Sequence, residues 1–453
     1  MAEIKKRELF GTDGIRGRAN EYPMTSEIAL ALGRALAFHF KGEGRHRRIL
    51  IGKDTRRSGY MLEMALASGI TSMGVDVLLV GPMPTPAVAF LTHGMRAEAG
   101  VMVSASHNSF QDNGMKVFDH SGFKLEDREE RKIESLMFSD LLTHHRPSPE
   151  KLGKAFRVEE ARGRYIEFLK GTFPKEQRLD GLKIVVDCAH GAAYQVAPTV
   201  FDELGADLNS MGVSPNGLNI NETGVVLPDL IKKRVIETKA DLGIALDGDA
   251  DRVLFVDEKG NLIDGDAIIA VLGAELLEQG ILKDGVVVAT VMSNIALEKY
   301  LDRRGGKVIR TQVGDRYLVE IMREKGYLFG GESSGHLIFR QYSTTGDGIL
   351  AALQLLALMR TKGKRLSELV SDYSPCPQVM KNVPVKERRV LEQIPSLMEK
   401  IHHLERDLGK EGRLLVRYSG TEPLVRIMIE GWDAKRIESM AQDLASSVAR
   451  ELS

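Results

Sequence analysis

The sequence predicts an α/β protein made of three similar mixed or parallel α/β units and a small C-terminal α+β domain, arranged around a central cleft. An order of strand, helix, strand, helix and strand repeats three times along the chain, which is the pattern of α/β sheets. The length of 453 residues also gives room for about three domains at ~100–200 residues each.

Each of the three units is expected to end in a polar loop. Strands of the first unit are predicted at Arg48–Gly52, Val75–Gly81 and Ala99–Ser104, with helices over residues 58–73 and from about 84. Strands of the second are predicted at Leu182–Cys188, residues 206–211 and Ala240–Leu246, with a helix over about 192–204. Strands of the third are predicted at Val286–Met292, Lys307–Val313 and Tyr327–Gly331, with a helix from about 314. The densest polar cluster of each unit follows its third strand, the position where open α/β sheets bind ligands.

The C-terminal part has a different order of elements. A helix near 390–408, strands at Arg413–Tyr418 and Leu424–Glu430, and a helix at Lys435–Leu452 predict a small α+β domain. The apolar segment Ile349–Met359 is expected to be a buried helix. With a first boundary in the polar stretch Thr143–Lys154, the predicted domains are 1–153, 154–255, 256–370 and 371–453.

Composition excludes several classes of protein. Hydrophobic residues make up 43% and charged residues 28%, which is ordinary for a globular protein and argues against disorder. The formal net charge of −1 gives no general attraction for nucleic acid or for an anionic membrane, so an anionic ligand requires locally placed cations. The two distant cysteines, Cys188 and Cys376, and the lack of a signal-like apolar stretch in Met1–Phe10 predict a cytoplasmic protein.

Three aspartates directly follow the last strand of the second unit. On an extended backbone, Asp247, Asp249 and Asp251 would project to the same face, and three converging carboxylates require a cation. Hard oxygen ligands favour Mg²⁺ or Ca²⁺. A calcium loop counted from Asp247 fails at its sixth position, which is Arg252 where glycine is needed, so Mg²⁺ is the expected ion. A solvated acidic turn is the alternative.

The loop after the first unit's third strand reads VSASHNSFQDNGMKVF and exposes the hydroxyl of Ser106 among small residues. Serine is a weak nucleophile unless a base or an ion activates it. Lys116 would carry a proton if its pKa were lowered, and would otherwise be a surface lysine. A polar turn with a helix cap remains the alternative to a nucleophilic loop, and there is no G-x-S-x-G elbow to support an esterase.

Three further loops carry candidate binding groups. GGESSGH offers the carboxylate of Glu332, the hydroxyl of Ser334 and the imidazole of His336, which suit sugar hydroxyls or an amine, although a plain loop fits as well. RYSGTEP, with Arg417 and the nearby Arg426, combines guanidinium groups, hydroxyls and backbone N–H groups as a phosphate site does. The glycine-dense loop Gly11–Gly17, which contains Arg16, matches neither a Walker loop nor a dinucleotide fingerprint.

Together these motifs resemble the α-D-phosphohexomutase family over essentially the whole chain. The resemblance rests on FGTDGIRG, SASHN, DGDADR, the GESSGH loop and RYSGTEP. Within the family, GKDTRRSG, TQVGDRY and STTGDG make the sequence most similar to the bacterial phosphoglucosamine mutases. Two positions depart from the usual pattern: Ser109 stands where proline follows the His-Asn pair, and Ser333 stands where asparagine or glutamine is common.

The resemblance implies roles for individual residues. Ser106 would be the phosphoserine, and Asp247, Asp249 and Asp251 would bind one Mg²⁺ together with its phosphate. Arg16, Lys116 and His336 would line the cleft, with Lys116 as general acid and base. Residues for sugar and phosphate recognition would be Glu332, Ser334, Arg417, Ser419, Gly420, Thr421 and Arg426.

The implied reaction converts glucosamine 6-phosphate into glucosamine 1-phosphate for amino-sugar nucleotide and cell-wall precursor synthesis. Phosphoserine 106 would give its phosphoryl group to the sugar, and the resulting glucosamine 1,6-bisphosphate would turn over and return its other phosphate to Ser106. A single phosphate clamp must then accept two sugar orientations, which predicts a mobile fourth domain hinged near Leu366–Pro377. A homodimer is possible within such a family.

Three other functions stay open from the sequence. A phosphomannomutase or phosphoglucomutase of the same architecture is the nearest of them. A magnesium-dependent phosphatase would pass the phosphoryl group to water. A non-catalytic protein that binds sugar phosphates would not depend on Ser106 for its ligand effects.

Overall fold

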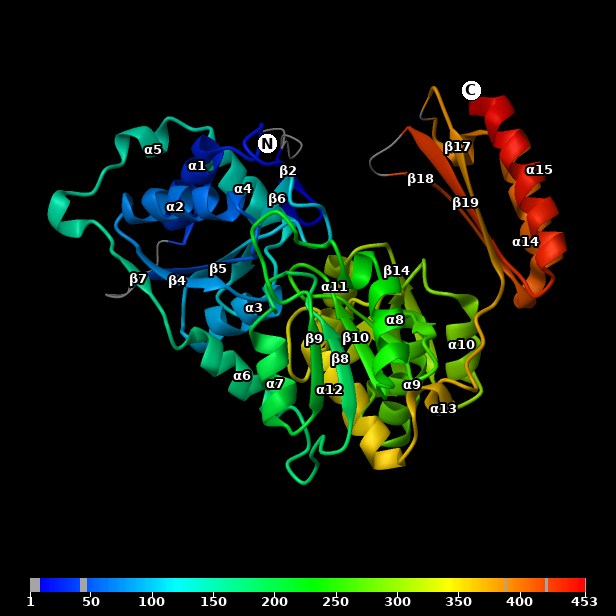
Figure 1. The fold of residues 1–453 in the computed structure, drawn as a ribbon. Helices are drawn as coiled ribbons and strands as arrows, with labels where there is room; N and C mark the ends of the chain where they lie inside the picture. The colour runs from blue at the N-terminus through cyan, green and yellow to red at the C-terminus, as the bar shows by residue number, and fades with distance from the viewer. Residues whose placement is uncertain (1–8, 41–46, 388, 420–422, 453) are drawn as a thin grey trace. The chain divides into compact units, whose positions relative to one another are not determined.

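The computed structural model describes residues 9–40, 47–387, 389–419 and 423–452, and these form two compact units (Figure 1). The larger unit contains the chain up to residue 292 together with residues 306–371. The smaller unit contains residues 293–305 and 372–453. Among the described residues, no helix is both long enough and apolar enough to cross a lipid bilayer.

The first sheet of the larger unit has the strand order β1-β2-β6-β5-β3-β4-β7. Its strands are β1 (Phe10–Gly11), β2 (Gly14–Arg18), β3 (Arg48–Lys53), β4 (Asp76–Pro82), β5 (Ala99–Val103), β6 (Asp112–Asp119) and β7 (Ala155–Arg157). Strands β3, β4 and β5 are parallel, as predicted. The sequence reading missed β6, which runs antiparallel to β5 because the chain turns back after the Ser106 loop.

Helices cover this sheet: α1 (Ser26–His39), α2 (Ser58–Thr71), α3 (Thr85–Gly94), α4 (Asp127–Met137) and the short α5 (Leu141–His144). Helices α1 and α2 cross closely, and the reason is a glycine on each. A Cβ atom at Gly33 would lie 2.4 Å from the Leu66 carbonyl oxygen, and one at Gly69 would lie 2.3 Å from that of Leu30. Any larger residue would force the two helices apart.

The second sheet has the order β12-β11-β10-β8-β9. Its strands are β8 (Lys183–Asp187), β9 (Asp207–Met211), β10 (Leu242–Leu246), β11 (Val253–Asp257) and β12 (Leu262–Ile263), and its helices are α6 (Ala161–Gly171), α7 (Val196–Glu203) and α8 (Asp229–Thr238). Strands β8, β9 and β10 are parallel, whereas β10 and β11 form an antiparallel hairpin. The turn of that hairpin carries the three aspartates.

The third sheet has the order β14-β13-β15-β16. Its strands are β13 (Val286–Thr290), β14 (Lys307–Thr311), β15 (Phe329–Gly331) and β16 (Leu337–Phe339), and its helices are α9 (Gly265–Glu278), α11 (Asp315–Lys325), α12 (Gly348–Lys362) and α13 (Leu366–Leu369). Helix α12 confirms the buried helix predicted at Ile349–Met359, because nearly all of its first twelve residues are buried. Its first turn is capped by Asp347, which accepts hydrogen bonds from the N–H groups of Ile349 and Leu350.

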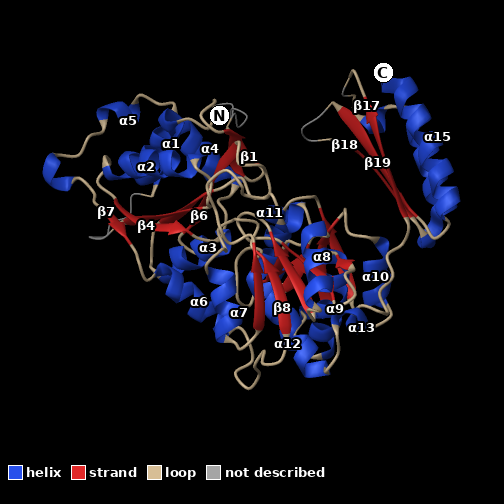
Figure 2. Cartoon of the chain, viewed as in Figure 1, coloured by secondary structure: helices blue, strands red, loops and turns tan. Residues whose placement is uncertain are grey.

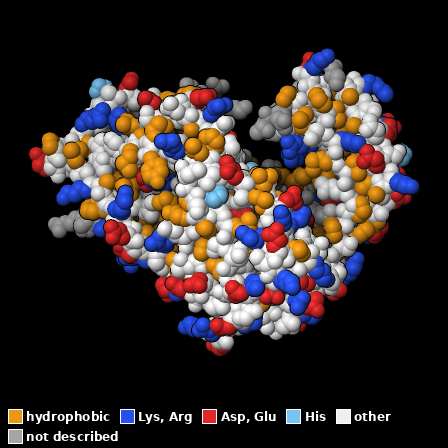
Figure 3. Space-filling view, viewed as in Figure 1, with side chains coloured by type: hydrophobic (Ala, Val, Ile, Leu, Met, Phe, Trp, Pro, Cys, Tyr) orange, Lys and Arg blue, Asp and Glu red, His pale blue; other side chains and the backbone are white. Residues whose placement is uncertain are grey.

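The smaller unit is the predicted α+β domain, with one addition. An antiparallel sheet in the order β17-β19-β18 contains β17 (Gln378–Pro384), β18 (Arg413–Tyr418) and β19 (Leu424–Glu430). Helices α14 (Pro395–Leu408) and α15 (Ala434–Leu452) cover one face of it (Figure 2). The addition is α10 (Ile295–Asp302), which comes from the segment 293–305 and packs within this unit. On the face of the molecule shown in Figure 3, basic and acidic side chains are interspersed, consistent with the net charge of −1.

Candidate active site

Ser106 lies in a strained turn directly after β5. Its φ of 52° is in the left-handed region, and its side chain is buried at 1% exposure. The Ser106 N–H donates to Ser104 Oγ at 2.9 Å, and the Ser106 hydroxyl donates to Asp247 Oδ2 at 2.7 Å. The hydroxyl that sequence reasoning singled out therefore points at the first of the three aspartates.

The aspartates converge, but through a different backbone conformation from the one expected. Their carboxylate oxygens lie within 4.8 Å of one another. The prediction that they share one face of an extended strand is wrong, because the chain turns at Ala250, whose φ is 57° and whose N–H donates to the Asp247 carbonyl at 3.1 Å. The hairpin turn between β10 and β11 brings the three side chains together.

The carboxylate cluster fits a divalent cation. Asp249 Oδ1 and Asp251 Oδ1 are buried and accept no hydrogen bond from the part of the chain that the structure describes. Burial, together with the negative charges of Asp251 and Asp249, raises the pKa of Asp247 well above its ordinary value. Buried, mutually repelling carboxylate oxygens are the donor set that Mg²⁺ or Ca²⁺ satisfies.

Lys116 enters the same cluster from β6, where it pairs with Met102 of β5. Its ammonium lies 2.9 Å from Asp249 Oδ2, 3.5 Å from Asp251 Oδ2 and 3.4 Å from Asp13 Oδ2. Burial alone would lower the pKa of Lys116, but the three carboxylates raise it above its ordinary value. In this arrangement the pKa of Lys116 is therefore shifted in the direction opposite to the lowering that a proton carrier needs.

Lys116 belongs to a closed ring of alternating charges, which we call the charge ring: Lys116, Asp13, Lys124, Asp315, His336 and Asp251. Asp13 and Asp315 both pair with the ammonium of Lys124. The His336 ring nitrogens lie 3.6 Å from Asp315 Oδ2 and 3.8 Å from Asp251 Oδ1. Burial opposes a charged imidazole, but Asp251 and Asp315 raise the pKa of His336. The ring joins side chains from all three α/β units.

Arg16 and the GGESSGH loop border the charge ring. Arg16, on β2, pairs with Asp13. Glu332 Oε1 accepts the Gly314 N–H at 3.1 Å, and the Ser334 hydroxyl lies 3.4 Å from Glu332 Oε2. Gly335 permits the close packing of this loop, because a Cβ atom there would lie 2.1 Å from the Val253 carbonyl oxygen. The predicted residues Arg16, Lys116, Glu332, Ser334 and His336 therefore gather beside Ser106 and the aspartates.

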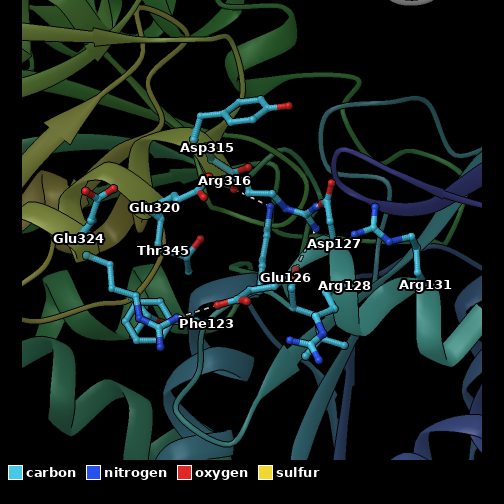
Figure 4. A pocket seen from close by; sticks show the side chains of 16 residues that line it. Phe123, Glu126, Asp127, Arg128, Arg131, Asp315, Arg316, Glu320, Glu324 and Thr345 are labelled. Atoms are coloured by element: carbon cyan, nitrogen blue, oxygen red, sulfur yellow. Dashed lines mark hydrogen bonds and ion pairs between the residues drawn. The ribbon is translucent and has the colours of Figure 1, made fainter. Parts of the chain in front are cut away.

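A cavity of about 700 Å³ is bordered by two members of the charge ring. Its walls come from α11, from the start of α4 and from the segment before α4 (Figure 4). Lys124 and Asp315 line it, and Arg316 crosses it to pair with Asp127 and Glu130. Its basic side chains face acidic ones, so the cavity has no charge of a single sign.

The predicted phosphate residues lie in the smaller unit. Arg417 on β18 and Arg426 on β19 are directly opposite each other in the antiparallel pair, and burial and the charge of Arg426 lower the pKa of Arg417. Ser419 is buried, and its N–H donates to the Leu424 carbonyl at 2.9 Å. Gly420 and Thr421 lie outside the described residues. Two facing guanidinium groups suit an anion that bridges them.

Sequence reasoning missed several members of the site. Asp13 and Asp315 each stand next to a glycine in a loop that carries one of the family motifs, so both could have been proposed as site residues from the sequence. Thr85, which donates to Asp249, opens a helix after a strand end and could have been found in the same way. Lys124 carried no such signal, because it stands outside every polar cluster and meets Asp315 only when the units pack together.

Comparison with known proteins gives a consistent result. Models of the four phosphoglucomutase/phosphomannomutase domains match in order: the α/β/α domain I at residues 7–143, domain II at 163–260, domain III at 264–376 and the C-terminal domain at 380–447. The chain is 56% identical to the phosphoglucosamine mutase of Citrifermentans bemidjiense, over 98% of each chain. It is also 56% identical to that of Myxococcus xanthus, over 99% of this chain and 98% of the other.

Solved structures share the fold. A phosphoglucomutase/phosphomannomutase family protein from Burkholderia thailandensis superposes with a TM-score of 0.80 at 23% identity and covers 97% of each chain. The N-acetylphosphoglucosamine mutase of Aspergillus fumigatus superposes with a TM-score of 0.69 at 21% identity, over 99% of this chain and 96% of the other. At these identities the likeness is one of fold.

Proposed function

The chain belongs to the phosphoglucomutase/phosphomannomutase family, whose members are isomerases, and from this premise we propose that it interconverts glucosamine 6-phosphate and glucosamine 1-phosphate. The sugar is proposed from the relatives named phosphoglucosamine mutase, which are 56% identical over nearly the whole chain. The product would serve amino-sugar nucleotide and cell-wall precursor synthesis in the cytoplasm.

The observation that supports the chemistry best is the hydrogen bond from Ser106 Oγ to Asp247 within the carboxylate cluster. In the proposed reaction, a sugar hydroxyl oxygen attacks the phosphorus on Ser106, the P–Oγ bond breaks, and the hydroxyl proton is passed on to Oγ. Ser106 Oγ then attacks the other phosphate of the reoriented glucosamine 1,6-bisphosphate. Its proton ends on the oxygen that this phosphate leaves, so atoms and charges balance.

Asp247, Asp249 and Asp251 are the residues that would hold Mg²⁺. A bound divalent cation supplies charge neutralisation for a transferring phosphoryl group. Lys116 lies 2.9 Å from Asp249 Oδ2 and is the proposed proton carrier. A divalent cation held by the aspartates would offset the carboxylate charges that raise the pKa of Lys116, and would so ease the release of its proton. Arg16 and His336 are proposed to line the site with it.

The remaining residues are proposed to bind the substrate. Glu332 would accept hydrogen bonds from the sugar and Ser334 would donate one to it. Glu332 is held by the Gly314 N–H, and Ser334 lies beside it. The phosphate that does not react would be bound by Arg417, Ser419, Gly420, Thr421 and Arg426. We further propose domain limits at 1–153, 154–255, 256–370 and 371–453, a hinge near Leu366–Pro377, and a homodimer as a possible assembly.

A phosphomannomutase or phosphoglucomutase activity is the second candidate, because the matching domain models carry those names. Initial rates with glucosamine, glucose and mannose 6-phosphates, each with Mg²⁺ and a trace of hexose 1,6-bisphosphate, separate the two. The proposal expects the highest kcat/KM for the glucosamine compound. A clear preference for mannose 6-phosphate would overturn it, and inorganic phosphate released in step with substrate loss would indicate a phosphatase.

A further inference from the structure

Two side chains from different α/β units grip the same two carbonyl groups of the Ser106 loop. Arg56 Nη2 donates to the carbonyl oxygens of Ser106 at 3.0 Å and of Asn108 at 2.6 Å. Asn221 Nδ2 donates to the same two oxygens, at 2.8 and 2.7 Å. We call this arrangement the carbonyl clamp. Arg56 is fully buried, and Asn221 is 6% exposed.

The clamp acts on the residue whose backbone is strained. Ser106 has a positive φ, a conformation that residues with a side chain seldom adopt unless their surroundings enforce it. Fixing the carbonyl groups of Ser106 and Asn108 fixes the peptide planes of the turn, and therefore the direction in which Oγ leaves the backbone. Gly248 lies directly beneath, and a Cβ atom there would be 2.7 Å from the Ser106 oxygen and 2.9 Å from Asn221 Nδ2.

Each clamp residue is itself held. Arg56 follows β3, and its backbone N–H and its guanidinium both bond to the buried carboxylate of Asp54. Asn221 comes from the loop before α8, where its N–H donates to the Ala189 carbonyl at 2.8 Å. The next residues of that loop, Thr223 and Gly224, donate to Asp187 at 2.6 and 3.0 Å. The clamp therefore assembles only when the first and second units are packed together.

We propose that Arg56 and Asn221 are positioning residues that keep Ser106 Oγ aimed at the aspartates. Because Asp54 balances the Arg56 charge, the guanidinium is assigned to the loop backbone and not to a phosphate. The inference rests on the proposed function, since it concerns how the phosphorylated serine is presented. Misplacement of a reacting group by about 1 Å can cost about 10²-fold in rate.

The test compares Asn221→Ala with a matched control, Asn261→Ala. Asn261 lies in the exposed turn between β11 and β12, and its side chain donates to Asp257 at 2.9 Å, so its truncation removes an asparagine hydrogen bond away from the clamp. We expect Asn221→Ala to lower kcat about 10- to 100-fold with KM changed less than about threefold. Asn261→Ala should keep kcat and lower Tm less than Asn221→Ala does, because Asn261 is exposed and loses one hydrogen bond where Asn221 loses two.

Arg56 provides the second variant pair. Arg56→Met removes all donors, whereas Arg56→Lys keeps one charged donor, so lysine should restore part of the kcat lost with methionine. The ³¹P resonance of phosphoserine 106, formed with glucose 1,6-bisphosphate, should shift or broaden in Asn221→Ala and match the unaltered protein in Asn261→Ala. Should an Arg56 variant fail to fold, Asn221→Ala decides alone.

The outcomes separate the two proposals. If the unaltered protein turns over but Asn221→Ala matches Asn261→Ala in kcat and in the ³¹P spectrum, the clamp is refuted and the proposed function stands. If the unaltered protein takes up no phosphate at Ser106, as seen by intact mass, the proposed function itself fails. A fall in kcat confined to the clamp variants supports the inference.

Discussion

The Ser106 region of the larger unit and the Arg417–Arg426 pair of the smaller one handle charge in opposite ways. In the charge ring, ammonium, imidazole and carboxylate groups alternate, so each buried charge has an opposite neighbour. On strands β18 and β19, two guanidinium groups of the same sign stand directly across from each other. Like charges in that position destabilise a sheet.

This difference indicates that the aspartate cluster suits a cation and that the arginine pair suits an anion. At the edge of the ring, Asp249 Oδ1 and Asp251 Oδ1 are buried and accept no hydrogen bond from described residues, so this cluster suits a cation. Arg417 and Arg426 place two guanidinium groups opposite each other on the sheet, an arrangement that suits an anion such as a phosphate.

The largest effect on activity is expected from the loss of the Ser106 hydroxyl. Ser106→Ala should reduce mutase turnover to background and prevent the uptake of one phosphate measured by intact mass, because no other hydroxyl occupies that position. Ser109→Ala, in the same loop, should retain activity. Substantial turnover by Ser106→Ala would contradict a mechanism that passes through phosphoserine 106.

Asp247→Asn should separate the stability of the metal-free protein from its activity. Burial and the neighbouring carboxylates raise the pKa of Asp247, so an amide there relieves repulsion and should raise Tm in the presence of a chelator. Added Mg²⁺ should raise Tm of the unaltered protein but not of the variant. Activity should fall by at least about 10²-fold.

The control for this variant is Asp257→Asn, at the other end of β11, where the carboxylate accepts hydrogen bonds from a turn. It is buried like Asp247 but is remote from the hairpin turn of the aspartates. It should keep the Mg²⁺ response. An equal Mg²⁺ shift in both variants would contradict the assignment of the cation site.

At the arginine pair, Arg417→Gln should raise KM for the sugar phosphate about 10- to 100-fold, since a charge-assisted hydrogen bond contributes about 1.5–3 kcal/mol. Its Tm should change little, because the Arg417 side chain is only half-buried. Arg413→Gln, on the same strand and face, should instead lower Tm, because Arg413 Nε lies 3.0 Å from the buried carboxylate of Glu430. If KM rises in Arg413→Gln and not in Arg417→Gln, Arg417 is not the residue that binds the phosphate.

The smallest effect on activity is expected at Asp347, a buried carboxylate that bonds to neutral donors: the Tyr165 hydroxyl and two backbone N–H groups. Burial raises the pKa of Asp347 to about 6 from an ordinary value of 3.8. The folded protein therefore holds a proton that the unfolded chain has released between pH 4 and 6, and stability from this group is lost as pH rises through that window.

Asp347→Asn cannot titrate but can still cap α12. The stability of the unaltered protein relative to this variant should fall by about 2 kcal/mol between pH 4 and pH 7, measured by denaturant unfolding. Parallel pH profiles for the two proteins would show that Asp347 titrates normally. The kcat of the variant at pH 7 should be close to that of the unaltered protein.

Much of the site was predictable because its key residues follow strands in short polar runs. Ser106 after β5, the aspartates after β10 and Glu332 after β15 each stand where the sequence placed them. Local signals failed where backbone conformation is set by packing. The alternating residues of the aspartate segment predict an extended strand and give no sign of the turn that the left-handed Ala250 makes.

Long-range pairings were not predictable from the sequence. Asp315 and Lys124 are 191 residues apart, and Asn221 is 115 residues from the carbonyl it binds. Strand β6 was missed for a related reason, since its polar residues Asp112 and Asn113 and Gly114 hide the pattern of a strand. These features depend on how the units pack, and no local run of residues encodes that.

The segment 293–305 determines where the C-terminal domain can be separated from the rest of the chain. Residues 264–376 match one family domain, yet α10 from within it belongs to the smaller compact unit, so the polypeptide passes between the units at 292/293, 305/306 and 371/372. Asn294 exchanges two hydrogen bonds with Cys376, and the Ile295 N–H donates to Glu430. A fragment cut at residue 372 would lose these contacts. A chimeric protein that takes its C-terminal domain from a relative should therefore take residues 293–305 from the same relative.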